Sequence, residues 1–219
     1  MITQGYIEFF KELEINNNTE WFHANKKRYE QHVKIPFTNL VQDLIPRLQH
    51  IEPEMPDTTK EVMMRINKDI RFSKDKTPYN LAMKANFTPG GRKSPNPGFY
   101  LGISSDALHV GGGIYHTSPA DLKKIRNYMI NHTEEASDLM QSKTIIETFG
   151  GIKGEQSKRI DKEFQAHVED MPFILNKQFF YMSQHPISMA LDENLINVLV
   201  DYFKIASSVH KFLKSAVNS

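Results

Sequence analysis

The sequence contains no cysteine. This absence excludes disulfide bonds, thiolate metal sites and cysteine nucleophiles, and it suits a protein kept in a reducing compartment. Long apolar runs are absent too, since stretches such as Leu195 to Val200 are far too short to span a bilayer. Residues 1–18 lack the basic start and apolar core of a signal peptide. We therefore expect a soluble, cytoplasmic protein with no membrane association.

A strong net charge is also lacking. The 27 basic and 26 acidic side chains leave a formal charge of +1, which disfavours a general nucleic-acid binder. The charge is nevertheless uneven along the chain. Residues 61–126 carry 11 basic and 5 acidic side chains, whereas residues 1–60 carry 7 and 9, and residues 127–219 carry 9 and 12. The basic side chains are therefore concentrated in the middle third.

Hydrophobic periodicity divides the chain into helical and strand-rich parts. The predicted parts are helices over 1–51, strands over 62–113, helices over 118–149, an ambiguous mixed part over 150–190, and a long apolar-striped helix over 192–217. The strands are short and follow one another closely, so they are expected to pair antiparallel. No repeat or linker divides the chain. We predict a single α+β domain over residues 1–219, with a central antiparallel sheet of about four or more strands and the N- and C-terminal helices packed on it.

The stretch MMRINKDIRFSKDKTPY, residues 63–79, is the strongest candidate for a functional site. Apolar and polar residues alternate from 64 to 72, which predicts a strand that presents Arg65, Asn67, Asp69 and Arg71 on one face. Two guanidinium groups beside an amide and a carboxylate could bind a phosphate or carboxylate bidentately, and Asp69 is a candidate general base. The alternative is a solvated strand face on which Asp69 simply pairs with an arginine.

Further candidates flank this strand. The loop that follows adds Lys74 and Lys76, which could close over an anion, and Tyr79 ends the motif. Asn25 shares a helical face with two aromatic residues in WFHANKKRY, residues 21–29, where a buried amide would need partners. None of these residues has a role that the sequence alone decides.

Three consecutive glycines, Gly111, Gly112 and Gly113, lie in HVGGGIYHTSPADL. They could let a ligand approach the backbone, close to a helix that we expect to begin at Pro119 with Ser118 as its N-cap. A tight turn or a bulge explains the glycines equally well.

No established catalytic or metal-binding pattern is present. The sequence has no P-loop, no G-x-S-x-G elbow and no H-E-x-x-H motif. The histidines and carboxylates show no spacing typical of a zinc site. The sequence therefore predicts no metal site, identifies no cofactor, and leaves open whether the protein is an enzyme.

Three stretches resemble a family of bacterial and fungal proteins called domain of unknown function 2461. They are WFHANKKRY, RINKDIRFSKDKTPY and the segment PGFYLGI…GGGIY…P…LKKIR, and the resemblance extends from about Tyr6 to Leu213. It implies a single α+β domain and supplies no catalytic residues. The positions that it marks as a motif are Arg65, Asp69, Arg71, Phe72, Ser73, Lys74, Lys76, Pro78 and Tyr79.

Two functional hypotheses follow. The first is a pocket for a small anionic ligand that carries a phosphate or a carboxylate. The second is a nucleic-acid or protein binding module, in which the same cations alternate with aromatic residues such as Phe72, Tyr79, Phe87, Phe99, Tyr100 and Tyr115. The sequence favours the first, leaves nucleic acid as the less favoured partner, and says nothing about oligomeric state.

Overall fold

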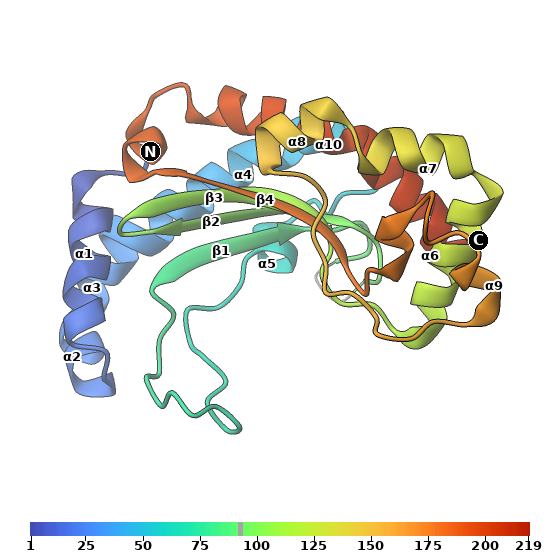
Figure 1. Cartoon of the computed structure of the whole chain (residues 1–219). Helices are drawn as coiled ribbons and strands as arrows, with labels where there is room; N and C mark the ends of the chain where they lie inside the picture. The colour runs from blue at the N-terminus through green and yellow to red at the C-terminus, as the bar shows by residue number, and fades with distance from the viewer. Residues whose placement is uncertain (92–93) are drawn as a thin grey trace.

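A computed structural model describes residues 1–91 and 94–219 and shows a single α+β domain (Figure 1). Its centre is a four-stranded antiparallel sheet in the order β1-β2-β3-β4, so each strand pairs with its neighbours in the sequence. The strands are β1 (Ala82–Phe87), β2 (Gly98–Ser104), β3 (Ala107–Ile114) and β4 (Phe179–Pro186). The predicted fold class is confirmed.

Helices precede the sheet, separate β3 from β4, and end the chain. They are α1 (Gln4–Ile15), α2 (Thr19–Ala24), α3 (Lys26–Arg28), a π-helical turn (Tyr29–Lys34), α4 (Ile35–Gln49), α5 (Thr59–Val62), α6 (Pro119–Asn131), α7 (Thr133–Met140), α8 (Lys143–Phe149), α9 (Lys162–Gln165) and α10 (Leu195–Val217). Short 3₁₀ segments occupy Pro172–Leu175 and Ile187–Leu191. Within the described ranges, no helix combines the length and apolar character needed to cross a membrane.

The sheet is covered by helices on one face only. In β1 the buried Met83, Ala85 and Phe87 alternate with the less buried Lys84 and Asn86, as expected for a strand with one face in the core. Helices α4, α6 and α10 pack on the sheet, and Figure 1 shows α4 and α10 crossing the same side of it. No helix within residues 1–91 and 94–219 crosses the opposite face (Figure 1), which is the side on which Lys84 and Asn86 lie.

The strand predicted over residues 64–72 does not form, and that prediction was wrong. Only its first half runs extended beside the chain that leads into β1, where Asn67 makes an isolated bridge with Tyr79. The amide of Lys68 donates to the carbonyl of Pro78 at 2.8 Å. Because proline has no N–H group, it cannot return a bond, and the ladder stops there. The polar residues after Asn67 therefore lie in a loop and not on one strand face.

The ambiguous part of the sequence supplies the fourth strand. β4 pairs along β3 from Ile114↔Phe179 to Ala107↔Pro186. Its burial alternates only at the start, where Phe179 and Tyr181 are buried, and its second half is half-exposed edge. A strand with so short an apolar pattern at the sheet edge gives a weak signal in the sequence.

Gly112 and Gly113 of β3 have structural explanations. A Cβ atom at Gly112 would lie 2.6 Å from the Tyr181 hydroxyl and 3.0 Å from His210 Nε2, so glycine makes room for this buried pair. The Tyr181 oxygen and His210 Nε2 are 2.7 Å apart, and the His210 ring stacks on Phe99 at 4.0 Å between centroids. Gly113 has a φ of +99°, which other residues rarely adopt. The contacts of His210 with Tyr181 and Phe99 fix α10 on the sheet.

The buried His210 makes stability depend on pH. Burial lowers the pKa of His210 to about 3, against an ordinary value of 6.5. Above pH 6.5 the unfolded chain also carries a neutral imidazole, so the full stability is present. As the pH falls below that value, only the unfolded state takes up the proton, and this group costs about 2 kcal/mol of unfolding free energy between about pH 7 and about pH 5.

We expect His210→Gln to be less stable than the wild type near neutral pH. Its amide can replace the hydrogen bond of the imidazole, but it cannot titrate. The difference should shrink by about 2 kcal/mol at about pH 5 in denaturant titrations followed by circular dichroism. His50→Gln, at an exposed position, is the matched control and should keep the wild-type pH dependence. Parallel pH curves for the wild type and His210→Gln would contradict this account.

Candidate functional site

Residues 63–81, here called the hairpin, project beyond the sheet between α5 and β1 (Figure 1). The base of the hairpin is fixed by Asn17, whose side chain donates to the Tyr79 carbonyl at 2.9 Å and accepts from the Tyr79 amide at 3.1 Å. The Tyr79 ring is buried and stacks on Phe22 at 4.0 Å between centroids. Tyr79 is therefore an anchor of the hairpin to α1 and α2, and its ring is not open to a ligand.

Most cations of the hairpin are already engaged within it. Lys68 Nζ lies 2.8 Å from an Asp75 carboxylate oxygen and 2.7 Å from the Thr77 hydroxyl. The hydrogen bond from Lys68 to Asp75, together with those from the amide and hydroxyl of Thr77, holds the pKa of Asp75 below its ordinary value. Lys76 Nζ donates to the Ile70 carbonyl at 3.0 Å. The loop is thus closed by its own charges.

Arg71 is paired with Asp69 in the same way. The guanidinium donates to both carboxylate oxygens, at 2.9 and 2.7 Å, and its side chain is 76% exposed. These bonds lower the pKa of Asp69, which keeps the carboxylate ionised and makes it a weak general base. Asp69 and Arg71 therefore bind each other, as in the alternative that the sequence left open, in which Asp69 pairs with an arginine.

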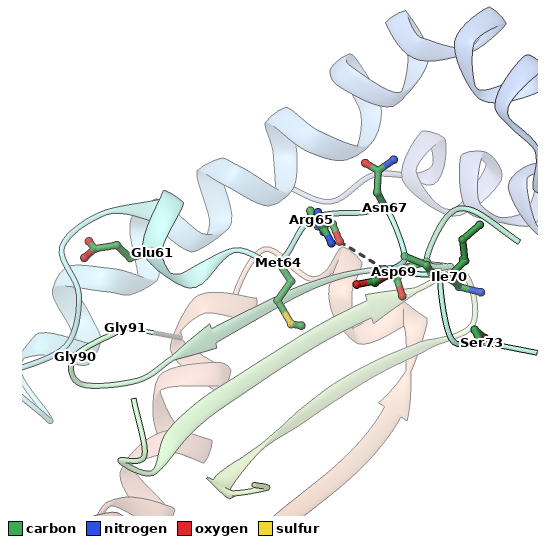
Figure 2. A pocket seen from close by; sticks show the side chains of 11 residues that line it. Glu61, Met64, Arg65, Asn67, Asp69, Ile70, Ser73, Gly90 and Gly91 are labelled. Atoms are coloured by element: carbon green, nitrogen blue, oxygen red, sulfur yellow. Dashed lines mark hydrogen bonds between the residues drawn. The ribbon is translucent and has the colours of Figure 1, made fainter. Parts of the chain in front are cut away.

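A hollow of about 1110 Å³ lies between the hairpin and the turn at Gly90 and Gly91 (Figure 2). Figure 2 shows Met64, Arg65, Asn67, Asp69 and Ile70 along the first arm of the hairpin. Glu61 on α5 and the turn at Gly90 and Gly91 lie at one end of this row, and Ser73 lies at the other. We call it the hairpin hollow. It is lined by Glu61, Met64, Arg65, Asn67, Lys68, Asp69, Ile70, Ser73, Asn80, Gly90 and Gly91.

Arg65 differs from the other arginine of the hairpin. Its guanidinium makes no hydrogen bond or ion pair with any residue that the structure describes, although its charge helps to lower the pKa of Asp69. The side chains of Asn67 and Ser73 likewise have no hydrogen-bond partner in the described ranges. A cation, an amide and a hydroxyl with free donors thus line the same hollow.

The remaining candidate residues lie elsewhere. Asn25 ends α2, where it donates to the Trp21 carbonyl at 3.0 Å and accepts from Arg28 at 2.9 Å. Lys74 is exposed and, like Lys76, does not line the hairpin hollow. Across the described part of the chain, no three His, Asp or Glu side chains gather in a way that could hold a metal ion.

The glycines of β3 adjoin a second hollow, of about 880 Å³, on the open face of the sheet. Gly112 and Gly113 line it together with Lys84, Asn86 and Tyr100, and Met64 lines both hollows. We call it the sheet-face hollow. Lys84 and Asn86 were not among the predicted site residues, although their alternation with apolar residues in β1 was a signal that could have placed them on an outward face.

The anchor at the base of the hairpin can be tested by Asn17→Ala. Loss of its two hydrogen bonds to Tyr79 should lower the unfolding free energy by about 1–2 kcal/mol and speed amide hydrogen exchange in residues 63–81. Asn16→Ala is the matched control, because among the described residues the side chain of Asn16 bonds only to the carbonyl of Glu12 within α1. Unchanged exchange in the hairpin of Asn17→Ala would contradict the assigned anchor.

Among known proteins, the chain matches the model of one family. A family model described as conserved hypothetical protein (DUF2461) matches residues 5–212, which is nearly the whole chain. A search of curated proteins finds no match. The match covers α1, the hairpin, the whole sheet and most of α10, as the resemblance of the three sequence stretches indicated. The chain therefore belongs to the DUF2461 family of conserved hypothetical proteins.

Proposed function

We propose that the protein binds a small anionic ligand, bearing a phosphate or a carboxylate, in the hairpin hollow. Arg65 provides the charge, and Asn67 and Ser73 provide further hydrogen bonds. The observation that carries this proposal is the unpaired guanidinium of Arg65 on the wall of a concave surface. A guanidinium has five donors in a planar fork that matches both oxygens of a carboxylate or phosphate.

The neighbouring charges support the same role. The other charged residues of the lining are Glu61, Lys68 and Asp69. Each is already engaged: Glu61 accepts from the Thr58 hydroxyl, Lys68 pairs with Asp75, and Asp69 pairs with Arg71. Internal pairing leaves these groups little free charge to offer a ligand. It also stiffens the loop that carries Ser73, which lowers the entropic cost of binding. Asp69 then acts by positioning Arg71 and not as a proton acceptor.

The rival hypothesis, a nucleic-acid binding surface, loses half of its six named stacking residues in the folded chain. Tyr79, Phe87 and Phe99 are only 4%, 1% and 0% exposed. Phe72 remains, since it is 95% exposed with the Arg71 guanidinium 5.9 Å from its ring centre. Tyr115 is also exposed, at 61%, and Tyr100 is half-buried, but both line the sheet-face hollow and neither lines the hairpin hollow. Phe72 beside a paired arginine is a small platform for a polymer, so the geometry favours the small ligand.

The charge of Arg65 can be tested with simple anions. Pyrophosphate and citrate should raise the melting temperature of the wild type in a thermal-shift titration, with a stabilisation of about 2.7 kcal/mol at a hundredfold excess over Kd. Arg65→Gln should abolish the shift, and Arg65→Lys should retain part of it, because an ammonium keeps the charge but not the bidentate geometry. Lys74→Gln, which removes one charge from the same hairpin outside the hollow, should leave the shift intact.

The outcome that contradicts the proposal is an equal loss of the shift in Arg65→Gln and Lys74→Gln, which would indicate diffuse attraction of anions. Salt separates the two hypotheses further. For a small ligand the shift should survive an increase from about 50 to about 200 mM NaCl, whereas binding of a fluorescent oligothymidylate would weaken steeply over that range.

A further inference from the structure

The floor of the sheet-face hollow is formed by large side chains that lie across glycines on the open face of the sheet. A Cβ atom at Gly102 would be 2.7 Å from the Tyr100 hydroxyl, so the Tyr100 ring lies along its own strand over Gly102. A Cβ atom at Gly111 would be 2.8 Å from the sulfur of Met182, its partner across the β3–β4 pair. The hollow therefore has a flat base of a phenol ring and a thioether.

One end of this floor is polar. Lys84 of β1 is the direct partner of Gly102 in the register of the sheet, so Lys84 and the Tyr100 hydroxyl lie at the same level on neighbouring strands. The ammonium of Lys84 and the amide of Asn86 have no hydrogen-bond or ion-pair partner within the described ranges. Burial raises the pKa of Tyr100, so its hydroxyl keeps its proton. Free donors thus gather at one end of an otherwise apolar surface.

A buried hydroxyl at the same site is unsatisfied. Thr88 follows β1, lines the hollow and is only 2% exposed. Its Oγ1 lies against Gly98 on the open face and finds no hydrogen-bond partner among the residues described. Buried hydroxyls are nearly always paired, because an unpaired one costs stabilisation. The Thr88 oxygen is itself closed to solvent, so this hydroxyl is part of the wall of the hollow and is not a contact for a ligand.

The charged side chain of the sheet-face hollow is positive. Among the described residues that line the hollow, Lys84 is the only lysine, and no arginine, aspartate or glutamate is present. An uncompensated ammonium at the edge of an apolar surface attracts an anion. The aromatic and thioether groups of Tyr100, Phe180 and Met182 favour contact with a flat ring.

We propose that the sheet-face hollow binds a flat aromatic carboxylate, with the ring over Tyr100 and Met182 and the carboxylate at Lys84 and Asn86. A volume of about 880 Å³ accommodates one or two fused rings with room for substituents. This site is separate from the anion site proposed at Arg65, which lies in the hairpin hollow on the other side of Met64.

The test uses naphthalene-2-carboxylate as the probe and the methionine methyl groups of the full chain as reporters, after ¹³C-methyl labelling. The Met182 methyl signal, assigned with Met182→Leu, should move upfield and saturate as the probe is added, because the probe ring covers the thioether. The methyl group of Met129, which is fully buried in the core, should not move. Lys84→Gln should weaken the affinity about tenfold through loss of a charge-assisted hydrogen bond, and Lys26→Gln, at an exposed position on α3, should not.

A second variant tests the flat floor. Gly102→Ala places a methyl group against the Tyr100 ring and should raise that ring, which weakens probe binding several-fold. The melting temperature of each variant shows whether it has folded. Naphthalene-2-methanol, which has the ring without the charge, should bind more weakly than the carboxylate to the wild type and equally to the wild type and Lys84→Gln.

The proposal is overturned if the Met182 signal does not move and saturate, or if Lys84→Gln binds the carboxylate as tightly as the wild type. Arg65→Gln should bind naphthalene-2-carboxylate with unchanged affinity. This variant separates the two proposals, since it removes only the anion site of the hairpin hollow. A loss of probe binding in Arg65→Gln that matches the loss in Lys84→Gln would also overturn the assignment of a separate site.

Discussion

The packing of α10 onto one face of the sheet is the contact on which the rest of the structure depends. At its centre, Gly112 leaves space for the buried Tyr181 and His210, whose polar atoms are 2.7 Å apart. A polar pair of this kind is tolerated in a core because each group satisfies the other. Since α4 and α10 cover the same side of the sheet, the opposite face is left open to other contacts (Figure 1).

The open face and the hairpin provide two different kinds of surface. The hairpin is charged and closed by its own ion pairs, Lys68 with Asp75 and Arg71 with Asp69. Exposed pairs contribute little to stability, but they decide which cations remain available. On the open face the charges are few, and aromatic and thioether groups lie flat across glycines. The first surface suits a compact anion and the second a flat ring.

The two hollows are neighbours because of how the hairpin joins the sheet. Its first arm runs beside β1, where the Met64 amide donates to the Lys84 carbonyl at 2.8 Å. Met64 therefore lines both hollows, and Lys84 is held close to the residue that separates them. A change in the position of the hairpin would alter both surfaces at once, which makes its anchor at Asn17 and Tyr79 important for either site.

The sequence by itself determined the α+β class, three of the four strands, the N-cap at Ser118 and the long final helix, because these features depend on local periodicity and capping chemistry. It also located the basic cluster from Arg65 to Lys76. Only the tertiary structure decided which of those cations are free. The alternation over 64–72 predicted a strand, but the partner at Pro78 lacks the N–H group that the pairing required.

The same limit explains the residues that were missed. Lys84, Asn86 and Tyr100 lie on adjacent strands, and their proximity follows from the sheet register and from the helices covering the other face. Gly111 and Gly112 are neighbours in the sequence, yet a Cβ atom at Gly111 would meet Met182 and one at Gly112 would meet His210. Local sequence cannot distinguish these roles, because the groups that the glycines accommodate come from β4 and α10, which lie far along the chain from β3.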